Sequence, residues 1–297
     1  MQAAPAKESS SLSLKAPAKI NLFLKILNRR PDGYHELESV MQKIGIFDML
    51  HFSRQGESIS LSSIGGEVPE GPENLVYRAA QAFFSATGIK AGVLITLEKN
   101  IPVAAGLGGG SSDAAAVLQG LNRLFSVNLK LNRLADIGLQ LGADVPFFVY
   151  DYSCALATGI GECLQEVEPI KDYWIVLVNP GFTLSTKWVY ENFPLTSCSN
   201  PYILARGRNR SSNYHIISHE LVEELGNDLE AVSVSRYPEI GEIKKEMKKA
   251  GAVAALMSGS GPTVFGLFSS KEEAQKSLTQ FAGKYGSKVF LVRPYIP

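Results

Sequence analysis

One stretch of the chain, residues 101–118 (IPVAAGLGGGSSDAAAVL), constrains the fold more than any other segment. Apolar and polar residues alternate over residues 92–98, which predicts a strand leading into it. After the glycines, apolar residues recur at helical spacing, at Ala114, Leu118, Leu121 and Phe125. The predicted order is a strand, a glycine loop and the N-terminus of a helix. This order indicates a phosphate site, because glycine lets the backbone approach a ligand and the first N–H groups of a helix attract anions.

The end of the loop narrows the kind of phosphate site. A P-loop ends in Gly-Lys-Ser/Thr, whereas here Ser111 directly follows Gly110. The dinucleotide pattern GxGxxG also fails, because Ser111 stands where its third glycine belongs. Ser111 or Ser112 is expected to cap the helix, and Asp113 suits the positive end of its dipole. A mobile glycine turn is the alternative, but the order of elements favours phosphate binding.

The composition is that of an ordinary globular enzyme and argues against several other classes. The 297 residues suit one large or two modest domains, and 45% of them are hydrophobic. Formal net charge is zero, so no overall field attracts nucleic acid or an anionic membrane. Three cysteines without a CxxC pair indicate reduced thiols in the cytoplasm. No apolar run approaches the ~20 residues of a membrane span, and residues 1–14 are predicted to be a disordered tail rather than a targeting peptide.

Strand and helix patterns are mixed without strict alternation, which indicates an α+β fold. Strands are predicted over residues 13–27, 36–46, 51–64, 92–98, 173–178, 253–257, 263–268 and 288–293, with a hairpin over 152–167. Helices are predicted after the glycine loop and over residues 74–86, 131–141, 186–193, 215–225, 238–250 and 272–285. Gly142 and Pro146 are expected to end the helix over 131–141, and residues 196–213 are expected to form a surface loop. The predicted domains are residues 1–168 and 169–297.

Two charged residues stand out among apolar neighbours. Asp144 lies in GADVPFF, where burying a carboxylate is costly without a partner, although it could simply cap a following turn. Lys19 is flanked by alternating apolar residues and could reach solvent from a sheet edge. Together with a phosphate loop they supply what phosphorylation of a hydroxyl needs. The aspartate accepts or orients the hydroxyl proton, and the lysine offsets charge on the transferring group.

Two further patterns are weaker. Residues 257–263 (MSGSGPT) are expected to form a turn between two strands, and their spacing leaves open whether the turn also approaches a ligand. His215 and His219 have the i, i+4 spacing of a helical metal pair, but without a third nearby ligand a surface position is favoured over a metal site.

Three separated stretches resemble the three motifs of the GHMP kinase superfamily. They are PAKINLFL at residues 17–24, PVAAGLGGGSSDAA at 102–115 and SGSGPTVF at 258–265. Three more resemble one branch of that superfamily, which phosphorylates a cytidine-diphosphate-linked sugar alcohol: RPDGYHELESVMQKI at 30–44, LGADVPFFV around Asp144, and GNDLE at 226–230. The resemblance runs from residue 14 to residue 292, with only 196–213 left out.

The resemblance implies a two-domain fold, with a ribosomal-S5-like N-terminal domain, a ferredoxin-like C-terminal domain and the active site in the cleft between them. It implies transfer of the γ-phosphate of ATP, with Mg²⁺, to the 2-hydroxyl of 4-diphosphocytidyl-2-C-methyl-D-erythritol in the non-mevalonate isoprenoid pathway. Asp144 is then the base or hydroxyl-orienting carboxylate, Lys19 its cationic partner, and Ser112 a candidate magnesium ligand.

The resemblance also assigns the binding residues by motif. ATP is expected to contact Asn74, Lys99, Pro102, Ala104, Ala105, Gly106, Leu107, Gly108, Gly109, Gly110, Ser111 and Ser112. The substrate is expected to contact Asn21, Tyr34, His35, Tyr190 and Gly259. Tyr34 and Tyr190 would lie on the two faces of the cytosine ring, and such stacking contributes roughly 1–3 kcal/mol per base.

Two rival functions stay open from the sequence. The first is a GHMP kinase for homoserine or mevalonate, which the PDGYH turn and Tyr190 disfavour because neither substrate has a base to stack. The second is a non-catalytic nucleotide-binding or RNA-binding module, which zero net charge and the joint presence of Lys19 and Asp144 disfavour. The expected partners are therefore small molecules, with no nucleic acid or membrane, and the protein is expected to be a monomer or homodimer.

Overall fold

The computed structural model describes residues 11–66, 68–194 and 225–297. The chain forms two compact units that are interleaved along the sequence. Among the described residues, the first unit holds 11–16, 47–101 and 109–150, and the second holds 17–46, 102–108 and the residues from 151 onward. The predicted domain boundary at residues 168–169 stays a prediction.

Two long strands contribute to both units. Strand β1 (Ser11–Arg29) and strand β2 (His35–Arg54) are joined by the turn at Pro31-Asp32-Gly33, as expected. The sequence predicted a break in strand structure after residue 46, but β2 continues to Arg54, and its last six residues, Met49 to Arg54, pair with the strand over residues 93–98. The break comes at Gln55 and Gly56, and β3 (Ile59–Ile64) follows as a separate strand. Residues 11–14, expected in the disordered tail, belong to β1.

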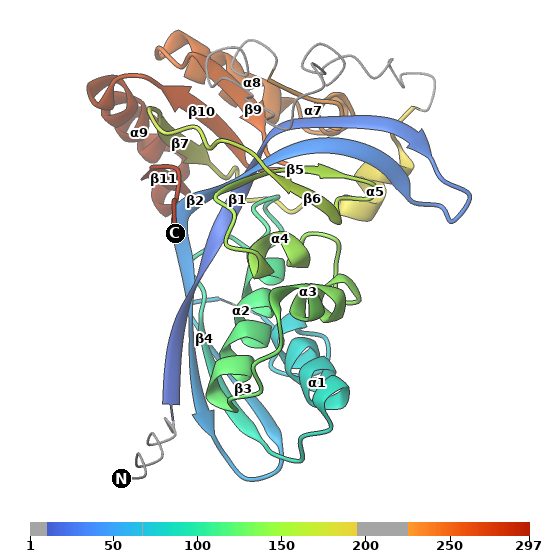
Figure 1. The fold of residues 1–297 in the computed structure, drawn as a ribbon. Coiled ribbons are helices and arrows are strands. Elements are labelled where there is room, and N and C mark those ends of the chain that lie inside the picture. The colour runs from blue at the N-terminus through green and yellow to red at the C-terminus, as the bar shows by residue number, and fades with distance from the viewer. Residues whose placement is uncertain (1–10, 67, 195–224) are drawn as a thin grey trace. The chain divides into compact units, whose positions relative to one another are not determined.

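In the first unit, helices pack beside part of a seven-stranded sheet. Strand β4 (Val93–Glu98) pairs antiparallel with the end of β2 and parallel with β3. The helices are α1 (Leu75–Thr87), α2 (Gly109–Leu124), α3 (Leu131–Leu139) and α4 (Val145–Val149). They gather on one side of β3 and β4, with α2 lying beside α1 and α4 (Figure 1).

Helix α4 was not predicted from the sequence. Helix α3 ends at Leu139, before Gly142 and Pro146 as expected, but Pro146 then lies in the first turn of α4. Proline is tolerated there because the first N–H groups of a helix have no partner within the helix. All five residues of α4 are buried, which explains its apolar sequence VPFFV.

The second unit contains the part of the β1–β2 hairpin around its turn, residues 17–46, and a separate four-stranded sheet. Strands β5 (Cys154–Thr158) and β6 (Cys163–Glu166) form the hairpin expected over 152–167, and β5 pairs with β2. A two-residue strand, β8 (Gly226–Asn227), runs parallel to β1 at Phe23 and Leu24.

The separate sheet has the strand order of a ferredoxin-like fold. Its strands are β7 (Trp174–Val178), β9 (Ala254–Met257), β10 (Val264–Phe268) and β11 (Val289–Val292), in the antiparallel order β11-β7-β10-β9. The helices are α5 (Thr186–Glu191), α7 (Glu230–Arg236), α8 (Pro238–Lys249) and α9 (Lys271–Tyr285), followed by the 3-10 turn η2 (Gly286–Lys288). Helices α8 and α9 pack on the sheet, giving the β-α-β-β-α-β order of this fold.

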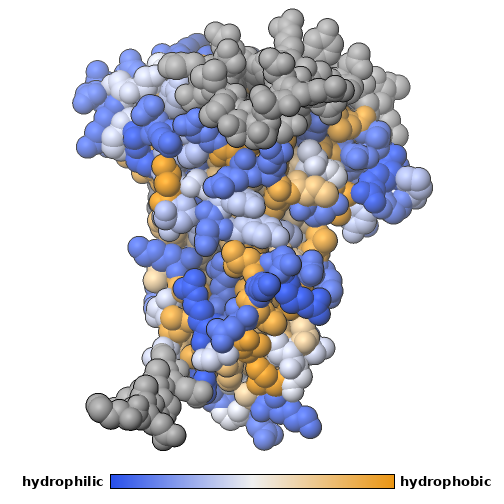
Figure 2. Space-filling model, in the orientation of Figure 1, coloured by the Kyte–Doolittle hydropathy of each residue, from blue (hydrophilic) through white to orange (hydrophobic). Residues whose placement is uncertain are grey.

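A single cluster of buried side chains holds this sheet and its helices together. Met247 of α8 and Phe281 of α9 meet Val176 of β7 and Phe268 of β10 in it. The strand residues alternate, so one face of the sheet carries the contacts. Figure 2 shows mainly hydrophilic residues over the outer side of α9, which is expected of a helix that buries only one face. The α+β prediction is confirmed.

Some predictions fall outside the described residues: the tail over 1–10, the loop over 196–213, the helix over 215–225 with His215 and His219, and Cys198. Across the described ranges, no helix combines the length and apolar character that crossing a bilayer requires.

Candidate active site

The glycine loop packs directly against the second glycine cluster. Gly106 has a φ of 78°, and a Cβ added there would lie 2.2 Å from the carbonyl oxygen of Ser258. Thr263 N–H donates to the carbonyl of Ala105 at 3.3 Å in the same region. The turn over residues 258–261 is therefore more than a connection between β9 and β10, because its backbone forms one wall of the glycine loop. Only glycine fits at position 106.

Lys19 reaches this loop from β1. Its side chain is buried, with 4% of the residue exposed, and its ammonium donates to Asn21 Oδ1 at 2.6 Å and to the Gly106 carbonyl at 3.2 Å. Its backbone N–H donates to the carbonyl of Leu107 at 2.9 Å. The alternative in which Lys19 reaches solvent from a sheet edge is therefore wrong. Lys19 is a buried cation that is held against the glycine loop by hydrogen bonds.

Asn21 extends the network on the same face of β1. Its Nδ2 donates to Ser39 Oγ at 2.8 Å, and Ser39 in turn donates to the Phe23 carbonyl at 2.7 Å. The turn at 258–261 closes over these groups, since a Cβ at Gly259 would lie 3.0 Å from Asn21 Oδ1 and 3.4 Å from Lys19 Nζ. Ser258 Oγ donates to the Gly106 carbonyl at 2.9 Å. The structure thus brings Lys19, Asn21, Gly106 and Gly259 together within the second unit, from three separate motifs.

The residues that follow the glycine loop belong to the first unit, where they form the N-terminus of α2. The helix begins at Gly109, so Gly109, Gly110, Ser111 and Ser112 form its first turn. Neither serine is the N-cap, which corrects the sequence prediction. A Cβ at Gly109 would lie 3.0 Å from Ile101 Cγ2 and 3.3 Å from Lys99 Nζ, so the missing side chain at this position makes room for the chain's own packing.

Close to this turn lies a buried ionic cluster that was not predicted from the sequence. Lys99 Nζ pairs with Asp48 Oδ2 and, at 2.9 Å, with Asp113 Oδ2. The other oxygen of Asp48 accepts the backbone N–H groups of Asn100 at 2.6 Å and Ile101 at 2.8 Å. Asp113 was expected at the positive end of the helix dipole, but it is buried in the second turn as a partner of Lys99.

The charges of this cluster perturb one another. Burial raises the pKa of the Asp113 carboxyl to about 7; the Lys99 ammonium opposes that rise and the Asp48 carboxylate adds to it. Burial lowers the pKa of Lys99, but Asp113 and Asp48 outweigh it and raise the value overall. Lys99 therefore stays charged and pairs with Asp48, which holds the backbone at Asn100 and Ile101. A sequence signal existed for Asp48, which stands alone in the apolar run GIFDML in the same way as Asp144.

Two more predicted residues lie in the first unit. Asn74 is the N-cap of α1, where its Oδ1 accepts the Val76 N–H at 2.9 Å and its Nδ2 donates to the Pro69 carbonyl at 2.7 Å. Asp144 stands at the N-cap position of α4, half-buried, but its carboxylate makes no capping hydrogen bond. The alternative of a purely capping role for Asp144 is therefore wrong.

The residues expected at the cytidine end differ in their surroundings. His35 is buried, and its ring lies 5.4 Å from the ring of Tyr190 and 6.5 Å from that of Phe193, measured between centroids. The pKa of His35 is lowered, mainly by burial and to a smaller extent by the charge of Arg29, and this favours a neutral imidazole. Tyr34 is 61% exposed, and its backbone N–H donates to Asp32 Oδ1 in the turn. Phe193, which lies just beyond the end of α5, was not among the residues predicted from the sequence.

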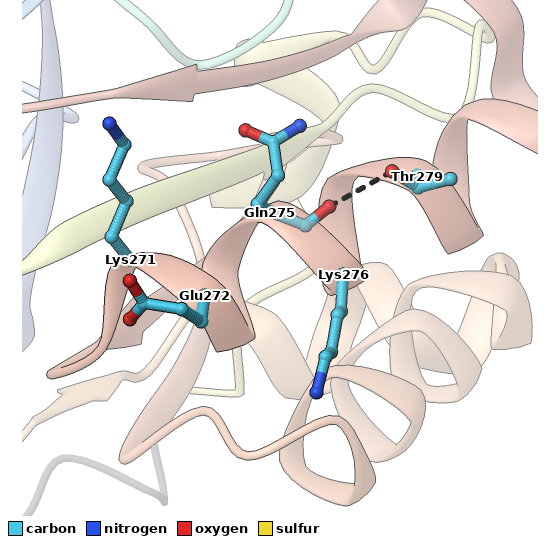
Figure 3. Close-up of a pocket in the computed structure, with 5 residues that line it drawn as sticks. All are labelled: Lys271, Glu272, Gln275, Lys276 and Thr279. Carbon is cyan, nitrogen blue, oxygen red and sulfur yellow. Dashed lines mark hydrogen bonds between the residues drawn. The ribbon is translucent and has the colours of Figure 1, made fainter.

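Other features of the described residues do not form a site of this kind. Figure 3 shows a hollow along α9 lined by Lys271, Glu272, Gln275, Lys276 and Thr279. All five side chains come from one helix, the ammonium of Lys271 lies 5.3 Å from the Trp174 ring, and the Thr279 hydroxyl donates to the Gln275 carbonyl. Within the described ranges, no three His, Cys, Asp or Glu side chains are grouped as a metal site.

Comparison with known proteins gives matches along most of the chain. The family model for the GHMP kinases N terminal domain matches residues 74–152, and that for the GHMP kinases C terminal matches residues 213–287. A protein of Syntrophotalea carbinolica named 4-diphosphocytidyl-2-C-methyl-D-erythritol kinase is 49% identical over 283 residues, covering 95% of this chain and 98% of that protein.

Solved structures show the same similarity. A crystal structure of a 4-(cytidine 5'-diphospho)-2C-methyl-D-erythritol kinase matches with a TM-score of 0.79 at 33% identity, covering 96% of this chain and 100% of that one. A homoserine kinase from Cytophaga hutchinsonii matches with a TM-score of 0.74 at 17% identity, covering 99% of this chain and 98% of that one. The second similarity is one of fold alone.

Proposed function

The chain belongs to the GHMP kinase family, and we propose that it transfers the γ-phosphate of ATP to the 2-hydroxyl of 4-diphosphocytidyl-2-C-methyl-D-erythritol. The observation that carries the proposal is the buried Lys19 ammonium held between Asn21 and the Gly106 carbonyl of the glycine loop. A cation in this position suits a transferring phosphoryl group. The 49% identity to a relative named 4-diphosphocytidyl-2-C-methyl-D-erythritol kinase supports the choice of substrate.

ATP binding is assigned to the glycine loop and the helix after it. The residues are Pro102, Ala104, Ala105, Gly106, Leu107, Gly108, Gly109, Gly110, Ser111 and Ser112, with Asn74 and Lys99 toward the nucleoside. Helix α2 has 16 residues and offers the free N–H groups of its first turn to the phosphates. Because the side chains of Asn74 and Lys99 already bind the chain itself, their main contribution is to fix the start of α1 and the entrance of the loop.

The chemical step is assigned to Lys19 and Asp144. The substrate 2-oxygen forms a bond to the γ-phosphorus, the bond from that phosphorus to the β,γ-bridging oxygen breaks, and the hydroxyl proton passes to the Asp144 carboxylate. Phosphoryl transfer has a loose transition state, so most of the acceleration comes from positioning and charge stabilisation. Lys19 supplies charge, and Asp144 orients the hydroxyl as well as accepting its proton.

One buried hydroxyl in the first turn of α2 is a suitable ligand for Mg²⁺. The hydroxyl of Ser112 is buried there without a hydrogen-bond partner, and a hydroxyl oxygen is an acceptable ligand for a cation that keeps most of its other ligands as water and phosphate. When bound, Mg²⁺ neutralises charge on the β- and γ-phosphates. Ser112 is the residue of this chain proposed to hold it.

The cytidine end is assigned to His35, Tyr34 and Tyr190, with Asn21 and Gly259 nearer the reacting hydroxyl. The half-buried Tyr190 packs beside the neutral His35 and presents an aromatic surface for a base. Tyr34 is exposed and free to cover the other face of the base. Binding energy from this remote group orients the reacting end.

The proposed setting is the cytoplasm, with small-molecule partners only and either a monomer or a homodimer as the working form. The zero formal net charge supports the exclusion of nucleic acid and anionic membranes.

The test is an ATP-consumption assay on the purified chain, with the cytidyl substrate, homoserine and mevalonate compared side by side. Only the cytidyl substrate should be phosphorylated. Tyr190→Ala should raise KM for that substrate and leave KM for ATP nearly unchanged, and CDP should compete with the sugar substrate. Turnover of homoserine or mevalonate, or competition of CDP with ATP alone, would overturn the substrate assignment.

A further inference from the structure

The segment Gly226-Asn227-Asp228-Leu229-Glu230 is a polar motif that the proposed chemistry leaves without a role. Its polar side chains all bind backbone groups of neighbouring segments. Asp228 Oδ2 accepts the Ile26 N–H at 2.9 Å, and Glu230 Oε2 accepts the Met257 N–H at 3.0 Å. The carboxylate of Glu230 also pairs with Lys244. The motif therefore fastens β1 on one side and the end of β9 on the other.

Asn227 makes the contacts closest to the proposed reaction. Its Nδ2 donates to two carbonyls, that of Met257 at 2.8 Å and that of Gly259 at 2.7 Å. Its Oδ1 accepts the Leu229 N–H at 3.0 Å. An amide nitrogen has two hydrogens, so both donors of Asn227 are used on the backbone of the turn over residues 258–261 and the residue before it.

The turn that Asn227 holds is the one that covers Lys19. Gly259 approaches so closely that a Cβ there would lie within 3.4 Å of Lys19 Nζ and 3.0 Å of Asn21 Oδ1. Asn227 is also paired with Leu24 of β1, the strand that carries both residues. Asn227 thus connects the strand bearing Lys19, through its strand pairing, to the turn that covers Lys19, through its side-chain amide.

We propose that Asn227 is a positioning residue for phosphoryl transfer, which acts by holding the turn at Gly259 against Lys19 and Asn21. The proposal rests on the proposed function, because it gives Lys19 a role at the transferring phosphoryl group. Asn227 makes no contact with substrate in this scheme. It sets the distance between the Gly259 backbone and the ammonium, and a misplacement of about 1 Å in such a site costs about 10²-fold in rate.

The chemistry of the contact explains why asparagine is required. Asn227→Asp keeps the shape and the oxygen that binds Leu229, but it replaces the donating nitrogen with an oxygen facing two carbonyls. Repulsion should then push the turn away from β8. Asn227→Ala removes the same contacts without repulsion, so the aspartate variant should be the more severe of the two.

The matched control is Asn122→Ala, at the far end of α2. Asn122 makes two side-chain hydrogen bonds to backbone, one fewer than Asn227, donating to the Leu129 carbonyl at 3.0 Å and accepting the Leu129 N–H at 2.8 Å. It has no place in the proposed machinery. Both alanine variants should therefore lose similar stability in thermal unfolding, which separates a purely structural effect from an effect on the reaction.

The experiment measures kcat and KM for the wild type, these three variants, Lys19→Met and the double variant Lys19→Met/Asn227→Ala. Asn227→Ala should lower kcat about 10-fold and Asn227→Asp about 10²-fold, with a smaller change in KM for ATP, while Asn122→Ala keeps the wild-type kcat. In the Lys19→Met background, Asn227→Ala should add little, because the two act through the same contact.

The outcomes separate the two proposals. A folded Asn227→Asp protein with wild-type kcat, or a full effect of Asn227→Ala in the Lys19→Met background, would overturn the role of Asn227 and leave the proposed function intact. If the wild type phosphorylated another hydroxyl compound instead, the substrate assignment would fail and the same variants would be measured on that reaction. A Lys19→Met protein with wild-type turnover would overturn both.

Discussion

The contact between Gly106 and Ser258 gives a sharp test of how the glycine loop works. Gly106 has a φ of 78°, and its missing Cβ would lie 2.2 Å from the Ser258 carbonyl oxygen. Gly88, which ends α1, has a similar φ of 69° but nothing within 4 Å of the Cβ position. Gly106→Ala and Gly88→Ala therefore share the cost of a left-handed alanine and differ only in the clash.

The size of each effect follows from this geometry. A left-handed conformation costs an L-residue about 1–2 kcal/mol, so Gly88→Ala should lower the free energy of unfolding by roughly that amount. Carbon-to-oxygen contacts in proteins come no closer than about 3.3 Å, so in Gly106→Ala the loop and the turn must separate by about 1 Å. That displacement moves the Gly106 carbonyl, which accepts a hydrogen bond from Lys19. A shift of this size in a site built for positioning costs about 10²-fold in turnover.

The assay combines chemical denaturation with steady-state kinetics of ADP release. Gly88→Ala should be less stable than the wild type with unchanged kcat, whereas Gly106→Ala should be at least as destabilised and lose kcat about 10²-fold. If folded Gly106→Ala retained kcat within a factor of two or three of Gly88→Ala, the packing of the loop against the turn would have no bearing on the reaction.

Three other predictions follow from individual residues. Asp144→Asn should keep the fold and ATP affinity but lose roughly 10²–10⁴-fold in kcat, as expected for a positioned proton acceptor; near-normal turnover would remove Asp144 from the mechanism. Lys99→Met should cost about 3–5 kcal/mol in denaturant unfolding, because it leaves the Asp48 and Asp113 carboxylates buried together. That loss should shrink at pH 5, where protonation removes the repulsion, and a loss independent of pH would contradict the assignment. Burial and Arg29 lower the pKa of His35 in the folded state, so its contribution to stability is present above the unfolded value of about 6.5 and is lost as the pH falls below it. His35→Phe should flatten the stability profile over that range, and an unchanged profile would assign the pH dependence to other groups.

The sequence by itself determined the elements whose signals are local. The period-2 pattern of β4, the helical pattern of α2 and the turn at Pro31-Asp32-Gly33 depend on near neighbours, and all three are confirmed. The α+β class followed from the order of such elements. Three motifs separated by long stretches of chain were enough to identify the family, and Lys19 and Asp144 stood out as charged residues among apolar neighbours. The sequence placed these residues on elements, but it gave no distances between them.

Only the tertiary structure decided which polar groups meet. The pairing of Lys99 with Asp48 and Asp113 joins residues 51 and 14 positions apart, and no periodic pattern reports such a contact. Gly106 contacts Ser258, which lies 152 positions away in the chain. This contact places the turn over residues 258–261 at one side of the glycine loop. Asn227 lies in the GNDLE motif, but the motif gives no partner for its side chain, and its contacts appear only where β8 lies beside β1. Local patterns record the burial of apolar side chains, whereas a buried polar group is defined by the partner that satisfies it, and that partner comes from elsewhere in the chain.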